Sequence, residues 1–241
     1  MKFMKSLLYK CLCINNVHKI NYNTITLFEK NDPIKYYSFK KTKKYYFENN
    51  LYYDLYKETP SINNNLLADK YNSPINYKKY TDLTAEHICP QSYLKKHPQA
   101  KFDMHNIFLT LKQINCNRSN YKYTDEYKFF NNIDNIYYFL DNNSKLTKYD
   151  SENNYKNNKL KLFIPYANSR GTIARSIAYM KVKYKNIILE DIIDLDVLLY
   201  WNYLYPPTEI EYIKNYKIRE IQGNSNYFIE KPELMDYYFD K

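Results

Sequence analysis

Residues 84–119 constrain the fold of this 241-residue chain more than any other stretch. Residues 84–89 have an extended pattern, two prolines mark turns behind them, and residues 102–108 are extended again. Thr110 and Gln113 then have the spacing of a capping box, which predicts a helix to the end of the stretch. We therefore expect a strand, a returning strand and a helix in direct succession.

The polar side chains of this stretch are those that a hydrolytic metal site needs. Glu86 and His87 are adjacent on the expected first strand, and Asn115 lies in the expected helix, 28 positions after the histidine (115 − 87 = 28). A neutral imidazole can take a proton from water, and carboxylate and amide oxygens can hold one hard divalent cation. These are the parts required to hydrolyse a phosphodiester with one metal ion. Neighbouring side chains of a regular strand point to opposite sides, so a bulge or a strand end must aim both inward.

The net charge agrees with a polyanionic substrate. Lys and Arg together number 36 against 26 Asp and Glu, which gives a net charge of +10. Such an excess favours nucleic acid or another anionic surface as partner. The same excess of positive charge also keeps a protein in solution without any such partner. The charge therefore supports a nucleic-acid substrate only in combination with Glu86, His87 and Asn115.

The rest of the chain reads mainly as helix. Thr208 and Glu211 form a second capping box, which predicts a helix to about residue 221. Residues 170–184 carry apolar side chains at steps of four, three and four, which predicts a helix with one buried stripe. The stripe consists of Ile173, Ile177, Met180 and Tyr184. Residues 46–80 and 192–201 also have helical character. The composition of residues 131–160 suggests a loose insertion.

Five motif-bearing segments follow one another along the chain. They begin at Glu86 (Glu-His-Ile-Cys-Pro-Gln-Ser), Asp103 (Asp-Met-His-Asn-Ile) and Asn115 (Asn-Cys-Asn-Arg-Ser-Asn-Tyr). The last two begin at Arg170 (Arg-Gly-Thr-Ile-Ala-Arg, then Tyr-Met) and Gln222 (Gln-Gly-Asn-Ser-Asn-Tyr-Phe-Ile, then Pro-Glu-Leu). In this order the segments resemble the endonuclease I family, whose active site is a His-Me finger, also called the ββα-metal motif. The resemblance runs from about residue 46 to 236.

The resemblance implies a fold and a division of the chain. It implies an α+β fold: a mostly helical single domain with an embedded ββα-metal (His-Me) finger. Residues 46–241 would form the nuclease domain, and residues 1–45 an N-terminal extension of uncertain structure.

The resemblance also implies roles for individual residues. His87 would be the general base for water, with Arg118 as a second catalytic residue. Glu86 and Asn115 would hold one Mg²⁺ ion, or Mn²⁺ or Ca²⁺, since oxygen ligands suit these ions better than zinc. The products would carry 5′-phosphate ends. Alignment with the family motif selects Asn115 as the metal ligand over the nearby Asn117 and Asn120. Asp103 and His105 would support the structure of the finger.

The expected substrate is DNA, RNA or both, bound with little regard to sequence because phosphates dominate the contacts. Arg118, Arg170 and Arg175 are the arginines available to clamp phosphate. Members of the family often carry a further arginine between the Glu-His pair and the Asp-x-His-Asn segment. Here that stretch offers lysines instead, namely Lys95, Lys96 and Lys101.

Two alternatives use the same residues differently. A nucleic-acid-binding protein without catalysis would fit the basic charge and the missing loop arginine. A zinc-stabilised module would use two histidines and two cysteines, although their spacing is unlike that of paired zinc knuckles. These four residues are His87, Cys89, His105 and Cys116. A disulfide between Cys89 and Cys116 is also possible.

The chain gives no sign of a membrane protein. No run of 18 or more apolar residues occurs, so we expect no transmembrane helix and no membrane partner. The first residues are basic, but Lys10 interrupts the apolar stretch and no small-residue cleavage site follows, so we expect no signal peptide. We expect a monomer.

Overall fold

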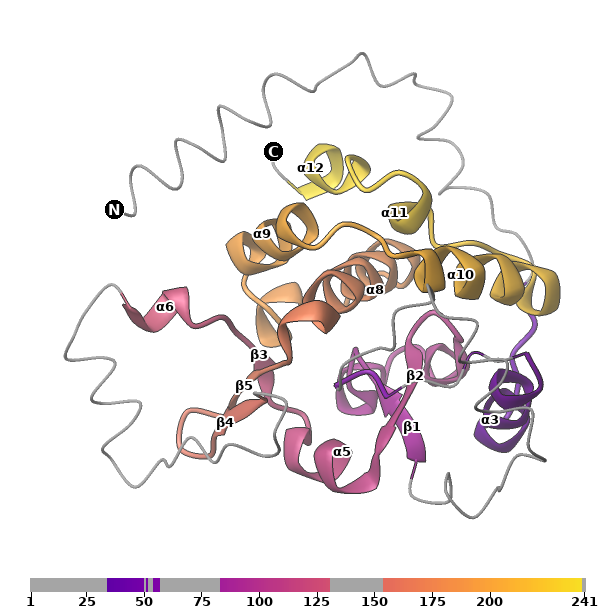
Figure 1. The fold of residues 1–241 in the computed structure, drawn as a ribbon, viewed down its shortest axis with the longest axis horizontal. Helices are drawn as coiled ribbons and strands as arrows, with labels where there is room; N and C mark the ends of the chain where they lie inside the picture. The colour runs from indigo at the N-terminus through magenta and orange to yellow at the C-terminus, as the bar shows by residue number, and fades with distance from the viewer. Residues whose placement is uncertain (1–33, 50, 52–53, 57–82, 131–153, 240–241) are drawn as a thin grey trace, which may run out of the picture.

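Two antiparallel strands and one helix form the unit on which the polar residues lie. The computed structural model describes residues 34–49, 51, 54–56, 83–130 and 154–239. Strand β1 (Leu83–His87) pairs with β2 (Ile107–Leu111), and α5 (Lys112–Arg118) follows β2 directly and packs against both strands (Figure 1). The expected order of strand, strand and helix is confirmed. The second strand begins later than expected, because a short 3-10 helix, η4 (Ala100–Phe102), and then a turn at residues 104–106 precede it.

The capping box expected at the start of α5 does not form. Thr110 belongs to β2, and its hydroxyl donates to Asp54 Oδ1 at 2.6 Å. The other oxygen of that carboxylate accepts the backbone N–H of Leu111 at 3.1 Å, and Leu111 is the N-cap residue of α5 without a side-chain cap. A distant carboxylate thus takes the hydroxyl that the local pattern assigned to the helix.

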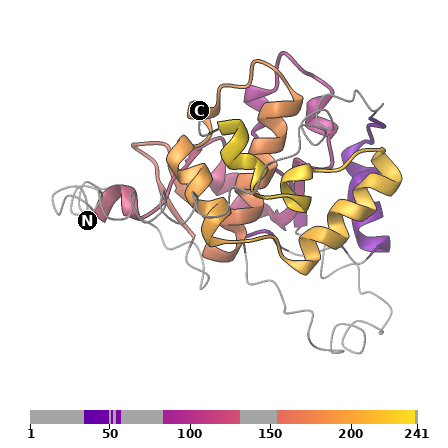
Figure 2. The ribbon, with the colours of Figure 1, turned by 90° about the horizontal axis from the view of Figure 1, so that it is seen from above.

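Helix α8 (Arg170–Lys183) lies at the centre of the helical layer. The four residues of the expected apolar stripe are buried, which confirms the helix and its inward face. Burial extends further than one stripe, however, because every residue from Arg170 to Met180 is buried. Helices α9 (Leu195–Leu204) and α11 (Tyr227–Glu230) pack against α8, and an Arg175–Glu211 ion pair joins α8 to α10 (Glu209–Gln222). Helix α12 (Leu234–Phe239) packs on α9 and α11 (Figures 1 and 2).

Helix α10 begins and ends as local signals predict. Thr208 and Glu211 form the expected capping box, with both hydrogen bonds present. The helix ends at Gly223, which has a φ of 103° in the left-handed region that glycine tolerates best.

A second sheet, of three short strands, lies beside the first unit. Its strand order is β3-β5-β4, with β3 parallel to β5 and β4 antiparallel to it. Most of the expected loose insertion, residues 131–153, lies outside the described residues, but its end forms β4. The strands are β3 (Lys122–Tyr123), β4 (Tyr155–Asn157) and β5 (Leu162–Ile164).

Four short helices complete the described elements. They are η3 (Gln91–Tyr93), α6 (Tyr127–Phe130), η5 (Ala167–Ser169) and η6 (Leu189–Asp191).

Helix α3 (Phe39–Glu48) packs on the two-stranded unit and shares a core with it. The buried hydroxyl of Tyr46 donates to the carbonyl oxygens of Met104 and Ile107, at 2.9 and 3.0 Å. The domain boundary expected between residues 45 and 46 therefore falls inside a helix that belongs to the core. The helical stretch expected at 46–80 is described only in part: residues 46–48 end α3, residues 54–56 are not helical, and residues 57–80 lie outside the described part.

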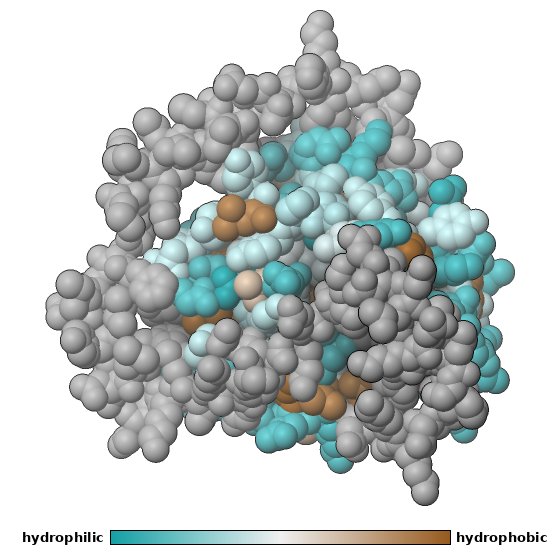
Figure 3. Space-filling model, viewed as in Figure 1, coloured by the Kyte–Doolittle hydropathy of each residue, from teal (hydrophilic) through white to brown (hydrophobic). Residues whose placement is uncertain are grey.

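The described surface is mostly polar. On the side shown in Figure 3, brown, hydrophobic residues gather in only a few small groups among hydrophilic ones. Within the described ranges, no helix has both the length and the apolar character needed to cross a membrane.

We expect Gly171→Ala to destabilise the fold. A Cβ at this position would overlap the carbonyl oxygen of Tyr205 and lie 2.8 Å from an Arg175 side-chain nitrogen. Helix propensity alone would favour alanine by about 1 kcal/mol. Overpacking costs about 1–3 kcal/mol or more, so the steric effect decides the sign. Thermal unfolding should show a melting temperature several degrees below that of wild type.

Thr172→Ala is the matched control, because it changes the next residue of α8 without adding an atom. It should melt close to wild type. An unchanged or raised melting temperature for Gly171→Ala would contradict the close approach of α8 to the chain at Tyr205.

Candidate active site

His87, the last residue of β1, is held in one orientation. Its side chain is buried, and Nε2 lies 2.8 Å from the carbonyl oxygen of Lys101. A carbonyl oxygen can only accept a hydrogen bond, so Nε2 carries the proton and donates it. In the neutral ring Nδ1 then keeps its lone pair, with Gln91 Nε2 at 3.4 Å. The imidazole is thus oriented to accept a proton at Nδ1.

The surroundings of His87 keep it neutral. The Phe39 ring packs against it edge to face, with the ring centroids 5.0 Å apart. Burial lowers the pKa of His87 from 6.5 to about 4, and the charges of Arg118 and Lys101 act in the same direction. The hydrogen bond to the Lys101 carbonyl opposes this shift. The ring is therefore unprotonated at neutral pH, which is the form that a general base requires.

Glu86 is a buried carboxylate with two partners. Its side chain is 1% exposed; Oε1 accepts the Tyr56 hydroxyl at 2.8 Å and lies 3.4 Å from Arg118 Nη1. Burial raises the pKa of Glu86, and Arg118 and the Tyr56 hydrogen bond oppose that change. A cation bound at this carboxylate would also favour its ionised form.

The strand register shows whether β1 contains a bulge at Glu86 and His87. Glu86 lies opposite Phe108 and His87 opposite Ile107, with one residue facing one throughout. The strand therefore contains no bulge at this pair. Of the two devices expected, a bulge or a strand end, the structure has the strand end, because β1 finishes at His87.

Asn115 on α5 faces the same side of β1 as Glu86. Its Nδ2 donates to Thr84 Oγ1 and to the carbonyl oxygen of Ala85, both at 3.0 Å. Since a carbonyl only accepts, these bonds fix the amide orientation and leave Oδ1 available. Thr84 and Glu86 are two residues apart on a regular strand and share a face. A carboxylate and an amide oxygen on one side of a strand suit a hard divalent cation.

The zinc and disulfide alternatives do not fit the described residues. In this part of the chain no three His, Cys, Asp or Glu side chains come together as a metal site. Cys89 and Cys116 are both free; burial raises the pKa of the Cys89 thiol to about 12, whereas Cys116 is exposed. The four-ligand set of two histidines and two cysteines is therefore wrong for this structure.

Arg118 lies at the site, but not where a phosphate clamp would lie. Its side chain is 1% exposed. Nη1 donates to the carbonyl oxygens of His87 and Ser119, both at 3.1 Å, and Nη2 donates to that of Ile88 at 2.6 Å. Its guanidinium also lies over the Tyr123 ring, 4.5 Å from the centroid. Arg118 thus braces the end of β1 against α5, because its donors point to the backbone rather than to solvent.

Arg170 and Arg175 are not brought to this site. Arg175 is 1% exposed and donates to both carboxylate oxygens of Glu211, at 3.0 and 2.6 Å. Arg170 is also buried and pairs with Asp125 and Glu126, at 2.9 and 2.7 Å. The expected contact with nucleic acid needs an accessible guanidinium. Both guanidinium groups are instead buried in ion pairs, which join α8 to α10 and to the segment after β3.

The three expected lysines lie in the segment that connects β1 to β2. Lys95 and Lys96 are exposed in the turn between η3 and η4. Lys101 is half-buried, with its amine over the Phe102 ring, 4.9 Å from the centroid. Lys101 therefore contributes two groups to the site. Its amine lies over Phe102, and its carbonyl oxygen accepts the hydrogen bond from His87 Nε2.

Asp103 and His105 occupy bracing positions behind that segment. The fully buried Asp103 accepts the hydroxyls of Tyr179 and Tyr184 on Oδ2, both at 2.7 Å, and the Gln222 amide on Oδ1 at 2.9 Å. His105 Nε2 donates to the carbonyl oxygen of Asn224 at 3.0 Å. These bonds tie the segment that carries the Lys101 carbonyl to α8 and to the end of α10.

Three site residues had no assigned role in the sequence. Tyr56 is one of 31 tyrosines, and that excess hides any individual signal. Phe39 precedes a lysine run whose pattern allows phosphate contact but is more often a solvated face, and neither interpretation gives the phenylalanine a role. Asn106 is part of a recognised motif, and its side chain bonds the N–H and the carbonyl of Cys89, at 2.7 and 3.1 Å. It thereby fixes the chain just after His87.

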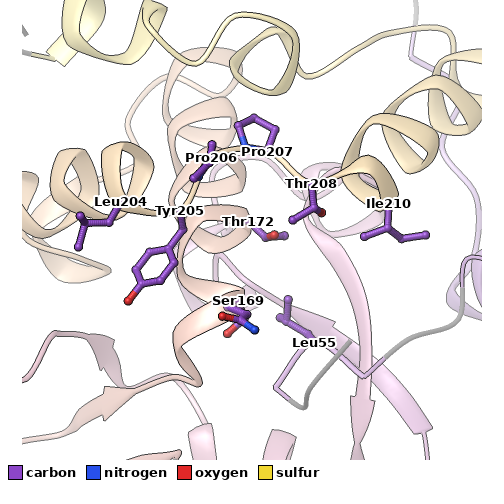
Figure 4. A pocket seen from close by; sticks show the side chains of 10 residues that line it. Leu55, Ser169, Thr172, Leu204, Tyr205, Pro206, Pro207, Thr208 and Ile210 are labelled. Atoms are coloured by element: carbon purple, nitrogen blue, oxygen red, sulfur yellow. The ribbon is translucent and has the colours of Figure 1, made fainter. Parts of the chain in front are cut away.

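A hollow of about 310 Å³ lies elsewhere, at the start of α8 and the connection from α9 to α10 (Figure 4). Ser169, Thr172, Tyr205 and Thr208 are among the residues that line it. Neither His87 nor either expected metal ligand borders it, so it does not belong to this site.

Comparison with known proteins agrees with these observations. A sequence model of the family described as Endonuclease I matches residues 4–233. An Endonuclease-1 from Buchnera aphidicola is 30% identical over 137 residues, which are 57% of this chain and 48% of that protein. A periplasmic deoxyribonuclease from Aeromonas hydrophila is 30% identical over 129 residues, 54% of this chain and 47% of that protein. An extracellular deoxyribonuclease from the same organism is 27% identical over 133 residues, 55% of this chain and 51% of that protein. The chain thus spans about half the length of the curated relatives it matches.

Proposed function

The chain belongs to the endonuclease I family, and on that premise we propose that it is a metal-dependent endonuclease that hydrolyses phosphodiester bonds of DNA, RNA or both. We also propose that β1, β2 and α5 are the His-Me finger of the site. One observation carries the proposal. His87, a neutral imidazole with its acceptor nitrogen at Nδ1, follows the buried carboxylate of Glu86, and the amide of Asn115 lies on the strand face of that carboxylate with its oxygen unbonded among the described residues.

In the proposed reaction His87 activates water. Nδ1 accepts a proton from the water as its oxygen forms a bond to phosphorus, and the bond from phosphorus to the 3′-oxygen breaks. The Lys101 carbonyl oxygen, which accepts the hydrogen bond from Nε2–H, holds the ring in place and stabilises the imidazolium that forms. The 3′-oxygen leaves and takes up a proton from solvent. One product then carries a 5′-phosphate and the other a 3′-hydroxyl.

Glu86 and Asn115 would hold a single ion of the Mg²⁺ type, with Mn²⁺ or Ca²⁺ as other candidates. Such an ion, when bound, supplies positive charge beside the phosphate and the leaving oxygen. The residues here fit it, because the amide nitrogen of Asn115 donates to Thr84 and Ala85 on β1 and its oxygen accepts no hydrogen bond from the residues that the structure describes. Tyr56 and Arg118 fix the position of the carboxylate.

DNA is the first substrate to test. Two of the similar proteins are named deoxyribonucleases, and the net charge of +10 suits any polyanion. We propose contact mainly with phosphates and little selection of sequence. We propose that the protein acts as a monomer.

The chemistry of the product ends tests this proposal. A supercoiled plasmid is nicked with the purified chain in Mg²⁺, and the nicked circles are treated with DNA ligase without prior kinase or phosphatase. We expect the ligase to reseal them, because it requires a 5′-phosphate beside a 3′-hydroxyl. Nicks that reseal only after end repair would contradict the proposed direction of bond cleavage. Uniformly labelled RNA incubated in parallel decides whether RNA is also cut.

The pH dependence of cleavage should reflect the buried imidazole. Its pKa of about 4 means that His87 stays neutral as the pH falls below 6.5, where an ordinary histidine would become charged. We therefore expect the acid limb of kcat/KM, measured at saturating Mg²⁺, to lie below pH 6.5. Protons that compete for Glu86, whose pKa is raised by burial, reduce activity further into the acid range. An acid limb at or above pH 6.5 would contradict the assigned state of His87.

A further inference from the structure

Helix α3 reaches the candidate base through its first residue. Phe39 begins α3, and its ring lies 5.0 Å from the His87 ring and 5.0 Å from the Phe102 ring, centroid to centroid. The first turn of α3 therefore forms part of the wall around the imidazole.

The position of α3 is fixed by polar contacts along its length. Lys43 Nζ donates to the carbonyl oxygen of Leu83 at 2.6 Å, which ties the helix to the start of β1. Tyr45 donates to the carbonyl oxygen of Lys217 at 2.9 Å, which ties it to α10. Figures 1 and 2 both show α3 beside α10 and next to the two-stranded unit. Side chains on the outer surface of α3 thus have a defined place relative to His87.

That outer surface is cationic. Lys40, Lys41 and Lys44 are exposed, and the first turn of α3 carries no acidic residue. Glu48 is the acidic residue of the helix and lies at its far end, 3.5 Å from Lys44. The positive charge is therefore concentrated at the end of α3 that contacts His87.

Lys101 adds a cation from the other side of the same aromatic contact. Its amine lies over the Phe102 ring, and Phe102 packs on Phe39. Lysines from two segments far apart in the sequence thus adjoin the pair of phenylalanines that packs beside the base: Lys40 and Lys41 follow Phe39, and the amine of Lys101 lies over Phe102. The arginines first expected to hold phosphate, Arg118, Arg170 and Arg175, are buried and bound to other groups. Accessible positive charge beside the base is supplied by lysine.

We propose that α3 is a substrate-binding arm whose Lys40 and Lys41, together with Lys101, bind backbone phosphates next to the phosphate that is cut. The inference rests on the proposed function and names residues that hold its substrate. A lysine run is commonly only a solvated face. The contact of Phe39 with His87 distinguishes this one, because it places the run at the reacting end of the site.

The test compares K40Q/K41Q with a matched loss of two charges elsewhere, K159Q/K231Q. Lys159 lies between β4 and β5, and Lys231 lies between α11 and α12. The probe is a fluorescently labelled DNA duplex, and its Kd is measured over a range of NaCl concentrations with His87→Ala in every protein. Each phosphate contact contributes about 0.9 to the slope of log affinity against log salt. We expect K40Q/K41Q to lower that slope by roughly two, and the control pair to leave it near that of the parent.

A steady-state measurement separates binding from chemistry. With His87 intact, K40Q/K41Q should raise KM and leave kcat nearly unchanged, and K40R/K41R should restore both KM and the salt slope. Slopes for K40Q/K41Q equal to those of K159Q/K231Q would overturn the inference, as would a loss confined to kcat. If the wild-type chain binds DNA but does not cut it, the proposed function fails, while the binding slopes still decide the role of α3.

Discussion

His87→Ala is expected to reduce cleavage by roughly 10²–10⁴-fold, the contribution typical of a general base. The loss should appear in the single-turnover rate, because Nδ1 takes the proton in the step that forms the new bond to phosphorus. Substrate binding should change little, since the buried imidazole offers no charge to a phosphate. Plasmid nicking at equal protein concentration measures the effect.

Two controls separate this chemical role from a structural one. His97→Ala removes a partly exposed imidazole from the same connection between β1 and β2 and should keep the wild-type rate. Added imidazole should restore part of the activity of His87→Ala, because the lost side chain leaves space between Phe39 and the Lys101 carbonyl. Wild-type activity in His87→Ala, with an unchanged melting temperature, would exclude His87 as the base.

Glu86→Gln should raise the Mg²⁺ concentration needed for half-maximal activity by at least about a hundredfold. Substituting a residue that hydrogen-bonds to a metal ligand already lowers metal affinity by about 10–100-fold, and Glu86→Gln removes the charge of the ligand itself. Glutamine keeps the size of the side chain and an acceptor for Tyr56. The measurement is a Mg²⁺ titration of the nicking rate, with Mn²⁺ binding followed by electron paramagnetic resonance.

The same substitution should also lower stability. It leaves the guanidinium of Arg118 buried without its anionic partner, and breaking a buried pair costs about 3–5 kcal/mol. Asn115→Ala reports on the metal separately, because the side-chain amide of Asn115 donates to Thr84 and Ala85 and not to the Glu86–Arg118 pair. Glu190→Gln, at an exposed carboxylate, is the control for lost negative charge. An unchanged Mg²⁺ requirement in both Glu86→Gln and Asn115→Ala would remove these residues as the metal ligands.

Local signals in the sequence predicted the framework of the site. The extended pattern before His87 and the turns behind it depend on neighbours within a few residues, and the helix that carries Asn115 forms where expected although the capping box that predicted it does not. The capping box at Thr208 formed, because its partner Glu211 lies three residues away. The box at Thr110 failed because Asp54, 56 positions earlier in the sequence, takes the hydroxyl. No pattern in the vicinity of Thr110 contains that information.

The arginines show the same limit at the site. A phosphate clamp and a buried ion pair use the same side chain, and only the partner distinguishes them. For Arg175 the partner is Glu211 on another helix, and for Arg170 it is Asp125 beyond β3. The sequence shows neither pairing. Phe39 escaped notice for a related reason, since its contact with His87 spans 48 positions (87 − 39 = 48) of chain.

Nicking of a supercoiled plasmid by the purified wild-type chain, in Mg²⁺ and then in EDTA, tests the central claim most directly. That claim is that His87 and an ion held by Glu86 and Asn115 act on one phosphate. We predict nicking in Mg²⁺, none in EDTA, and recovery when Mg²⁺ is restored in excess. Nicking that continues in EDTA would contradict the need for the ion, and DNA binding without nicking in Mg²⁺ would show that the site does not catalyse hydrolysis.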